Sequence, residues 1–269
     1  MEERVNVDLE DLSSSGALLE TFIQEMQSHD PLILIGIFVA LAIVFVTAVF
    51  FGNLFGSRKV RNVVLLLGLC DSGKTLLFTR LLIGKFVRTQ MSFTESCASY
   101  KCKNDKATSW TLIDVPGHES LRSQIVEKYK AMARAIVFVV DSSVFQKDVR
   151  DVAEFLYSTL TDNMVAKNAP AVLVACNKQD VAVAKSAKLI QQQLEKELNT
   201  LRVTRSAALS SQDDAVGMGG SVYLGKKGKD FEFSQLPNRV EFIECSACGD
   251  KGEDGDADID ALEKCLAKL

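Results

Sequence analysis

The stretch VVLLLGLCDSGKT, residues 63–75, decides the fold of this chain. Its five β-forming apolar residues lead into a loop, Gly68 to Thr75, that matches the pattern G-x-x-x-x-G-K-[ST]. Such a loop joins a buried strand to a helix, and its main-chain N–H groups surround the phosphates of a nucleotide. Lys74 is placed to reach the β and γ phosphates, and Thr75 to bind Mg²⁺. The stretch therefore predicts a nucleotide-binding α/β domain, without choosing between ATP and GTP.

Short apolar runs alternate with amphipathic stretches along the rest of the chain. We expect strands at 63–67, 99–103, 110–114, 135–141, 171–177 and 240–246. We expect helices near 74–83, 120–132, 148–163, 183–202 and 257–268. Continuous β-branched runs between helices are typical of a mainly parallel sheet that is covered on both faces. The sequence thus predicts a six-stranded α/β fold with its ligand at the carboxyl ends of the strands.

Residues 206–238 interrupt this alternation. They are rich in glycine, serine and charge and have neither helical nor strand periodicity, which predicts a long surface insertion. Lys226, Lys227 and Lys229 could contact membrane phosphates or an acidic partner, but a solvated charged loop is the favoured interpretation.

A second motif, CNKQD at residues 176–180, follows a predicted strand and favours guanine. The Asp180 carboxylate would accept hydrogen bonds from N1 and the exocyclic amine of guanine, whereas adenine would leave that charge unpaired. Asn177 and Lys178 would hold the neighbouring loops and cover the base. The motif is short, but its position at a strand end about one hundred residues after the phosphate loop makes it specific.

The segment ECSAC, residues 244–248, follows the last predicted strand. Beside Ser246, the Ala247 N–H could reach O6 of guanine. Alternatively, Cys245 and Cys248 would form half of a metal knuckle. The sequence holds no second C-x-x-C, which favours the guanine interpretation.

The composition fits one globular domain with extra segments: 269 residues, 47% hydrophobic and 25% charged. The seven cysteines lack the dense, even spacing of a disulfide scaffold, so a reduced, cytosol-facing domain is expected. Residues 1–30 hold eight acidic residues and one basic residue, which leaves residues 57–269 with a net charge of +3. A basic stripe for nucleic acid is not evident, and no direct nucleic-acid binding is expected.

Residues 32–51, LILIGIFVALAIVFVTAVFF, carry no charge. A helix of this length is about 30 Å long, which matches the hydrocarbon core of a bilayer. A buried core helix or a cleaved signal peptide fits such a run less well. Arg58, Lys59 and Arg61 follow the run and an acidic stretch precedes it, so the C-terminal side is expected in the cytosol.

The predicted organisation has four parts. A lumenal acidic N-terminus (1–31) precedes one transmembrane helix (32–51), a short basic linker (52–61) and a cytosolic nucleotide-binding domain (62–269). About ten linker residues reach no further than about 35 Å, so the domain would be held close to the bilayer.

The motifs GLCDSGKT, DVPGH, NKQD and CSA, in this order, resemble those of Ras-superfamily GTPases, and GLCDSGKT with LLIGKF is most similar to the Arf/Sar branch. With its acidic stub, single span and the stretches ACNKQD and FEFSQLP, nearly the whole chain resembles the family of signal recognition particle receptor β subunits. The resemblance implies a Ras/Arf-like P-loop GTPase, single-pass in the endoplasmic reticulum membrane, that holds the receptor α subunit as a heterodimer when GTP is bound. Signal recognition particle, ribosome and translocon would be indirect partners.

The resemblance also implies the ligands, GTP or GDP with Mg²⁺, and the residues that bind them. The nucleotide-binding residues would be Gly68, Cys70, Asp71, Ser72, Gly73, Lys74, Thr75, Leu76, Ser92, Gly117, Asn177, Lys178, Asp180, Ser246 and Ala247. The Mg²⁺ ligands would be Thr75, Ser92 and Asp114, the last directly or through water. Thr94 is the alternative to Ser92, and Cys248 replaces the lysine that is usual in this family.

The resemblance leaves hydrolysis open. His118 follows Gly117 as in translational GTPases, where a histidine orients the attacking water, but it could equally only pack in the folded switch. Arg88 and Arg122 are conceivable arginine fingers, although solvated arginines are the favoured interpretation. Two other functions are open: a membrane scaffold that holds GTP as a static structural ligand, and an Arf/Sar-like vesicle-coat GTPase.

Overall fold

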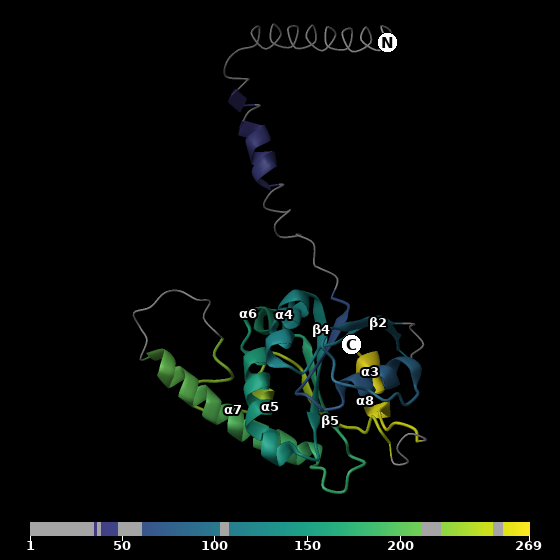
Figure 1. The fold of residues 1–269 in the computed structure, drawn as a ribbon. Coiled ribbons are helices and arrows are strands. Elements are labelled where there is room, and N and C mark those ends of the chain that lie inside the picture. Colours follow the sequence, from purple (N-terminus) through teal and green to yellow (C-terminus); the bar gives the residue numbers. More distant parts are fainter. Residues whose placement is uncertain (1–34, 37–38, 48–60, 103–107, 211–221, 250–254) are drawn as a thin grey trace, which may run out of the picture. The chain divides into compact units, whose positions relative to one another are not determined.

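The structure is a computed structural model that describes residues 35–36, 39–47, 61–102, 108–210, 222–249 and 255–269 (Figure 1). The chain divides into two compact units, Met1–Arg58 and Lys59–Leu269. This division falls within the predicted linker, residues 52–61.

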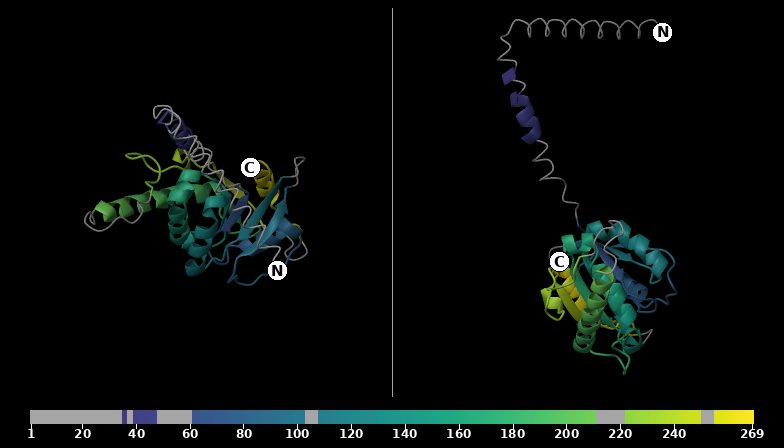
Figure 2. Two further views of the ribbon diagram at one scale, coloured as in Figure 1. Left: turned by 90° about the horizontal axis from the view of Figure 1, so that it is seen from above. Right: turned by 90° about the vertical axis from the view of Figure 1, so that its left-hand side faces the viewer.

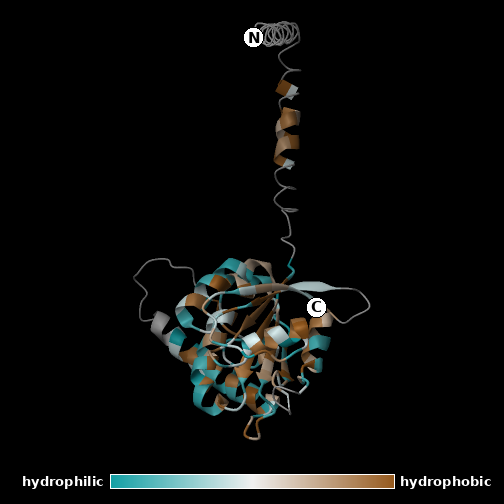
Figure 3. Ribbon diagram, turned by 45° about the vertical axis from the view of Figure 1, so that its right-hand side comes forward, coloured by the Kyte–Doolittle hydropathy of each residue, from teal (hydrophilic) through white to brown (hydrophobic). Residues whose placement is uncertain are grey.

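In the first unit, residues 35–36 and 39–47 are helical, and their apolar side chains are exposed. Figure 3 shows this segment as almost uniformly hydrophobic. The rest of the predicted span, together with the acidic N-terminus, lies outside the described residues. Within the described ranges, no helix has the length and apolar character needed to cross a membrane.

Six strands form the sheet of the second unit, in the order β2-β3-β1-β4-β5-β6. They are β1 (Val63–Leu67), β2 (Ser96–Lys101), β3 (Ser109–Asp114), β4 (Ala133–Asp141), β5 (Ala171–Asn177) and β6 (Val240–Glu244). Only β2 runs antiparallel, against β3. The prediction of a six-stranded, mainly parallel α/β sheet is confirmed.

Helices cover both faces of this sheet, as predicted (Figures 1 and 2). They are α3 (Lys74–Ile83), α4 (Glu119–Tyr129), α5 (Phe145–Leu160), α6 (Asn163–Asn168), α7 (Ala187–Ser210) and α8 (Asp260–Ala267), with 3₁₀ turns η1 (Lys130–Met132) and η2 (Phe233–Gln235).

The alternating side chains of β1 separate two hydrophobic cores. Val63, Leu65 and Leu67 pack with residues of α5 and α7, whereas Val64 and Leu66 pack with residues of α3 and α8. Because side chains alternate along a strand, this central strand contributes fully buried residues to both cores. Packing on both faces therefore holds the carboxyl end of β1 in place, and the phosphate loop begins directly after it.

The prediction that residues 206–238 form a surface insertion is wrong for the first and the last parts of this segment. Helix α7 continues to Ser210, and Leu224, Phe231 and Phe233 are buried among core residues. Phe233 lies between two rings, with centroids 5.3 Å from Phe231 and 5.0 Å from Phe242. The apolar residues of this segment fill the core from an irregular backbone, so no periodicity reveals them. Residues 211–221 lie outside the described part.

Candidate nucleotide-binding site

The phosphate loop follows β1, and its glycines are required by close contacts. Gly68 has φ 147°, and a Cβ there would lie 2.3 Å from the Val139 carbonyl oxygen. Gly73 has φ 90°, and a Cβ there would lie 2.3 Å from Asn177 Nδ2. Only glycine combines these conformations with such close approach. The loop therefore leads directly into α3, whose N-terminus faces the site.

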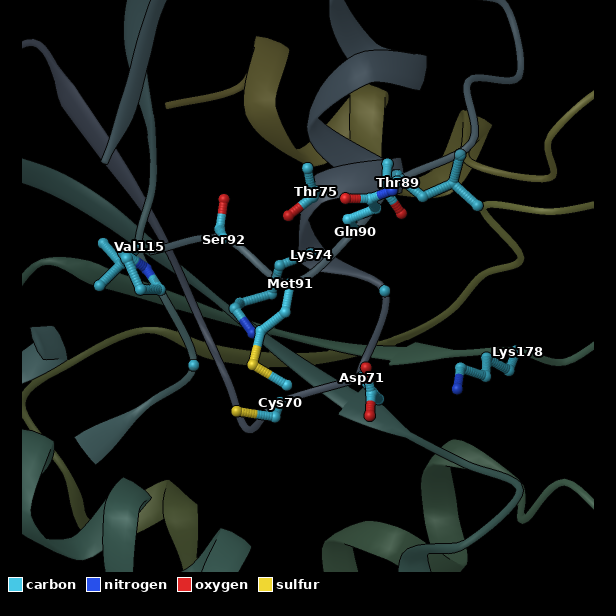
Figure 4. A pocket seen from close by; sticks show the side chains of 14 residues that line it. Cys70, Asp71, Lys74, Thr75, Thr89, Gln90, Met91, Ser92, Val115 and Lys178 are labelled. Carbon is cyan, nitrogen blue, oxygen red and sulfur yellow. The ribbon is translucent and has the colours of Figure 1, made fainter. Parts of the chain in front are cut away.

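A cavity of about 310 Å³ opens beside this loop (Figure 4). It is lined by Cys70, Asp71, Gly73, Lys74, Thr75, Leu76, Thr89, Gln90, Met91, Ser92, Val115, Pro116, Gly117 and Lys178. Nine of these, with Ser92 and Lys178 among them, are residues that the sequence predicted for the site. Thr89, Gln90 and Met91 were missed because no local motif marks them, and Val115 and Pro116 were missed although they lie within DVPGH. The competing candidate Thr94 does not line the cavity.

Lys74 is almost fully buried, and its Nζ donates a hydrogen bond to the Leu69 carbonyl oxygen at 2.6 Å. Burial lowers the pKa of Lys74, and the nearby carboxylate of Asp114 opposes that shift. A desolvated ammonium group is well suited to bind phosphate oxygens, because these oxygens would replace the solvation that the ammonium group lacks.

Thr75 lines the cavity, and its Oγ1 donates to Asp114 Oδ2 at 2.7 Å, although Asp114 itself does not line the cavity. The Asp114 side chain is fully buried, and its Oδ1 has no hydrogen-bond partner among the described residues. An uncompensated buried carboxylate oxygen beside a hydroxyl is the oxygen donor set that Mg²⁺ prefers. In Figure 4, Ser92 also lies at the Thr75 side of the cavity. These residues fit the predicted metal site.

Asp114→Asn should stabilise the metal-free protein and remove its stabilisation by Mg²⁺. The pKa of Asp114 is raised by burial, and the hydrogen bond from Thr75 and the charge of Lys74 only partly oppose this shift. The ionised carboxylate therefore costs folding free energy above this raised pKa, and the cost disappears as the pH falls through it. Melting in EDTA at pH 7.5 should show a rise of about 2–4 °C for the variant, and a smaller rise at pH 5.

Asp141→Asn is the matched control for this experiment. Although burial raises the pKa of Asp141, hydrogen bonds from Lys178 and Ser143 lower it overall. Its ionised form is therefore favourable in the folded state, and the substitution should lower the melting temperature at pH 7.5. A fall in melting temperature for both variants would contradict the assigned cost of Asp114.

Asn177 ties the phosphate loop to the loop after β6. Its Nδ2 donates to the Ser72 carbonyl oxygen, and its Oδ1 accepts from the Ala247 N–H, both at 2.9 Å. The Ala247 N–H thus faces Asn177 in this structure. Asp180 is exposed, and its Oδ1 accepts from Ser246 Oγ at 2.5 Å. The predicted guanine residues are therefore joined in one network beside the cavity.

Lys178 is held by a residue that sequence reasoning missed. Lys178 has a left-handed backbone, φ 65°, and its Nζ lies 2.5 Å from Asp141 Oδ2. Asp141 ends β4, the strand beside β5, so the ion pair crosses the carboxyl edge of the sheet. An aspartate at the end of a predicted strand was the available signal. The pair fixes the lysine stem at the cavity wall.

His118 lies outside the nucleotide cavity. It is exposed and occupies the N-cap position of α4 without a capping hydrogen bond from its side chain, and its Nδ1 lies 2.9 Å from Ser120 Oγ. With Arg122 it lines a neighbouring cavity of about 630 Å³, where the Arg122 guanidinium stacks 3.9 Å from the centroid of Phe155. Gly117 lines both cavities, and a Cβ there would lie 2.6 Å from the Cys70 nitrogen. A movement of Gly117 would thus change the shape of both cavities.

The order of the strands, the phosphate loop, the Thr75–Asp114 hydrogen bond and the Asn177 link between two loops together define the class. This is a small GTPase fold. The family model described as signal recognition particle receptor beta subunit matches residues 59–240. The human receptor subunit beta is 60% identical over 251 residues, which cover 93% of this chain and 92% of the human protein. The chain belongs to the family of signal recognition particle receptor beta subunits.

Solved structures agree with this assignment. A chain of the mammalian SRP receptor is 61% identical, has a TM-score of 0.66, and is matched over 77% of this chain and 98% of that chain. The SRb–GDP chain of the signal recognition particle receptor from Chaetomium thermophilum is 25% identical, with a TM-score of 0.56 over 78% of this chain and 98% of that chain.

Proposed function

We propose that this chain binds GTP and GDP with Mg²⁺ and acts as a membrane-anchored switch that holds the receptor α subunit when GTP is bound. The observation that carries the proposal is the Asn177 side chain, which bonds both the phosphate loop and the Ala247 loop. In this proposal, the loop that binds phosphate and the loop beside the base are therefore held together by one side chain. The related Chaetomium thermophilum chain is described in a GDP form, which supports the same ligand class.

Each group in the site has a role in this proposal. The loop N–H groups and Lys74 bind the β and γ phosphates, and Asp180 binds the guanine edge. Thr75, Ser92 and Asp114 hold Mg²⁺, which when bound neutralises charge on the phosphates. The Gly117 N–H bonds the γ phosphate, so the segment that begins α4 responds to its presence.

Competition titrations test the ligand choice. GTP and GDP should displace a fluorescent GDP analogue at least about a hundredfold more effectively than ADP, because adenine leaves the Asp180 carboxylate unpaired. Equal competition by ADP would contradict guanine recognition.

The segment between α3 and β2 gives the partner interaction its dependence on nucleotide. Met91 and Ser92 line the cavity, whereas the side chains of Val87 and Phe93 are 41% and 70% exposed. These exposed apolar side chains are available for contact with the partner in this proposal. Because one short segment serves both the cavity and this surface, the bound nucleotide would set the conformation offered to the α subunit.

The membrane anchor is the residue 32–51 span, with the N-terminus lumenal and the GTPase domain in the cytosol at the endoplasmic reticulum. The uncharged run and the basic residues after it support this topology. In microsomes, the protein should resist alkaline carbonate extraction, and external protease should digest residues 62–269. Release by carbonate would contradict a spanning anchor.

His118→Ala should slow single-turnover hydrolysis of bound GTP by about a hundredfold, the lower end of the usual contribution from a positioned acid or base. The imidazole would turn from Ser120 toward the attacking water when Gly117 engages the γ phosphate. Ser120→Ala, which removes the hydroxyl that lies 2.9 Å from the ring, is the matched control and should not slow hydrolysis. Equal rates for wild type and His118→Ala would remove His118 from the mechanism.

A further inference from the structure

Arg80 is a buried arginine that bonds main-chain carbonyl groups on both arms of one loop. It lies in α3 and is 3% exposed. Its Nε donates to Ala247 O at 3.0 Å, and its Nη2 donates to Cys248 O at 3.1 Å and Gly255 O at 2.7 Å. A fourth hydrogen bond runs from Nη1 to the carbonyl oxygen of Gly84, the C-cap residue of α3, at 3.1 Å. The planar fork of an arginine suits several fixed acceptors at once.

These acceptors belong to the loop that follows β6. Ser246 and Asp258 close the loop with two main-chain bonds of 2.8 and 2.9 Å. Gly249 turns the chain at φ 83°, where a Cβ would lie 2.0 Å from Asp256 O. Arg80 therefore joins the outgoing arm to the returning arm and anchors both to the helix that begins at the phosphate loop.

The same loop contacts the side chains that the proposed function assigns to base recognition. Ser246 Oγ donates to Asp180 Oδ1 at 2.5 Å and accepts from the Gly249 N–H at 2.8 Å. The Ala247 N–H donates to Asn177 Oδ1 at 2.9 Å. Residues 246 and 247 thus contact two polar side chains of the base motif, Asn177 and Asp180, and Arg80 binds the carbonyl oxygens of Ala247 and of the next residue, Cys248. A shift of this loop would therefore move the Asp180 carboxylate away from the position in which it accepts hydrogen bonds from guanine.

We propose that Arg80 is a positioning residue for guanine selectivity, acting through the Ser246–Ala247 segment on Asp180. The inference rests on the proposed guanine-nucleotide binding, and it adds the residue that holds Asp180 in position. Arg80 does not touch the nucleotide cavity itself, so its loss should change which base is preferred more than it changes phosphate binding.

Arg202 offers a matched control, because it has the same chemistry at a different place. It is 4% exposed, lies in α7, and donates to the carbonyl oxygens of Leu224, Lys226 and Lys229 at 3.3, 3.2 and 2.6 Å. Those residues belong to the segment after α7 and not to the base loop. A purely structural role for Arg80 would make the two arginines equivalent.

The experiment measures dissociation constants for GDP, IDP and ADP on the full-length protein in detergent, for wild type, R80A, R80K and R202A. IDP lacks the exocyclic amine, so the ratio of IDP to GDP constants reports the second hydrogen bond of Asp180. We expect R80A to lower this ratio about tenfold and to speed GDP release about tenfold, the effect of misplacing one charge-assisted bond. R80K, with fewer donors, should lower the ratio about threefold, and R202A should leave it within about twofold of wild type.

The outcomes separate the inference from the proposed function. A wild type that binds ADP as well as GDP would contradict guanine binding itself. A wild type that prefers GDP, with an unchanged IDP to GDP ratio in R80A, would overturn the role of Arg80. If R80A does not fold, R80K decides: an unchanged ratio in a variant that melts like wild type overturns the proposal. An equal fall in the ratio for R202A would also overturn it.

Discussion

Asp180→Asn should lower the affinity for GDP at least about a hundredfold, because two hydrogen bonds to a charged acceptor are disturbed at once. The same change should raise the affinity for xanthosine diphosphate, since the asparagine amide can donate to the carbonyl that replaces the exocyclic amine. Asp180 is exposed and already oriented by Ser246, so the substitution needs no repacking. Competition with the two diphosphates measures both effects on one sample.

Asp230→Asn is the matched control for this change. Asp230 accepts a hydrogen bond from Asn199 Nδ2 at 3.1 Å, outside the base network. Its replacement should leave both affinities at the wild-type values. If Asp180→Asn retained GDP preference, the base would have to be recognised by other groups, and the role given to the CNKQD motif would fall.

Lys74→Ala should lower the affinity for GDP and GTP by about a hundredfold or more, because charge-assisted bonds to phosphate oxygens are lost. Burial lowers the pKa of Lys74, so the charged side chain costs folding free energy below that pKa in the absence of nucleotide. The nucleotide-free variant is therefore expected to melt no lower than wild type. Isothermal titration and thermal melting measure the two effects separately.

Lys130→Ala controls for the loss of a lysine. Lys130 lies 2.5 Å from Glu127 and 2.7 Å from Asp162 and does not line the nucleotide cavity. It should lower stability and leave nucleotide affinity unchanged, the reverse of the pattern for Lys74. Retained affinity in Lys74→Ala would contradict the placement of the phosphates.

The sequence predicted the central strands and the phosphate loop closely, because long apolar runs and a contiguous motif are local signals. Strand β5 and helix α3 have the expected bounds, and Thr75 and Asp114 meet as expected. Strand β2 begins three residues earlier than predicted, because SCASYK is a half-polar edge strand without an apolar run. Its position is decided by pairing with β3, which is not visible locally.

The missed parts of the site depend on contacts between distant residues. Arg80 bonds carbonyl groups about 170 positions away, and no motif encodes such a pairing. A signal was nevertheless present: a charged residue on the apolar face of α3, between Leu77 and Leu81, both of which are buried. A buried arginine needs several acceptors, so such a position predicts a main-chain loop against that face.

The central claim, that bound nucleotide controls the grip on the receptor α subunit, is tested most directly by quantitative capture. The full-length protein, loaded in parallel with GDP or with a non-hydrolysable GTP analogue and Mg²⁺, is incubated with the N-terminal domain of the α subunit. The account predicts at least about tenfold tighter binding with the GTP analogue, a coupling within the usual range between two ligands. Equal binding in the two nucleotide states would contradict it.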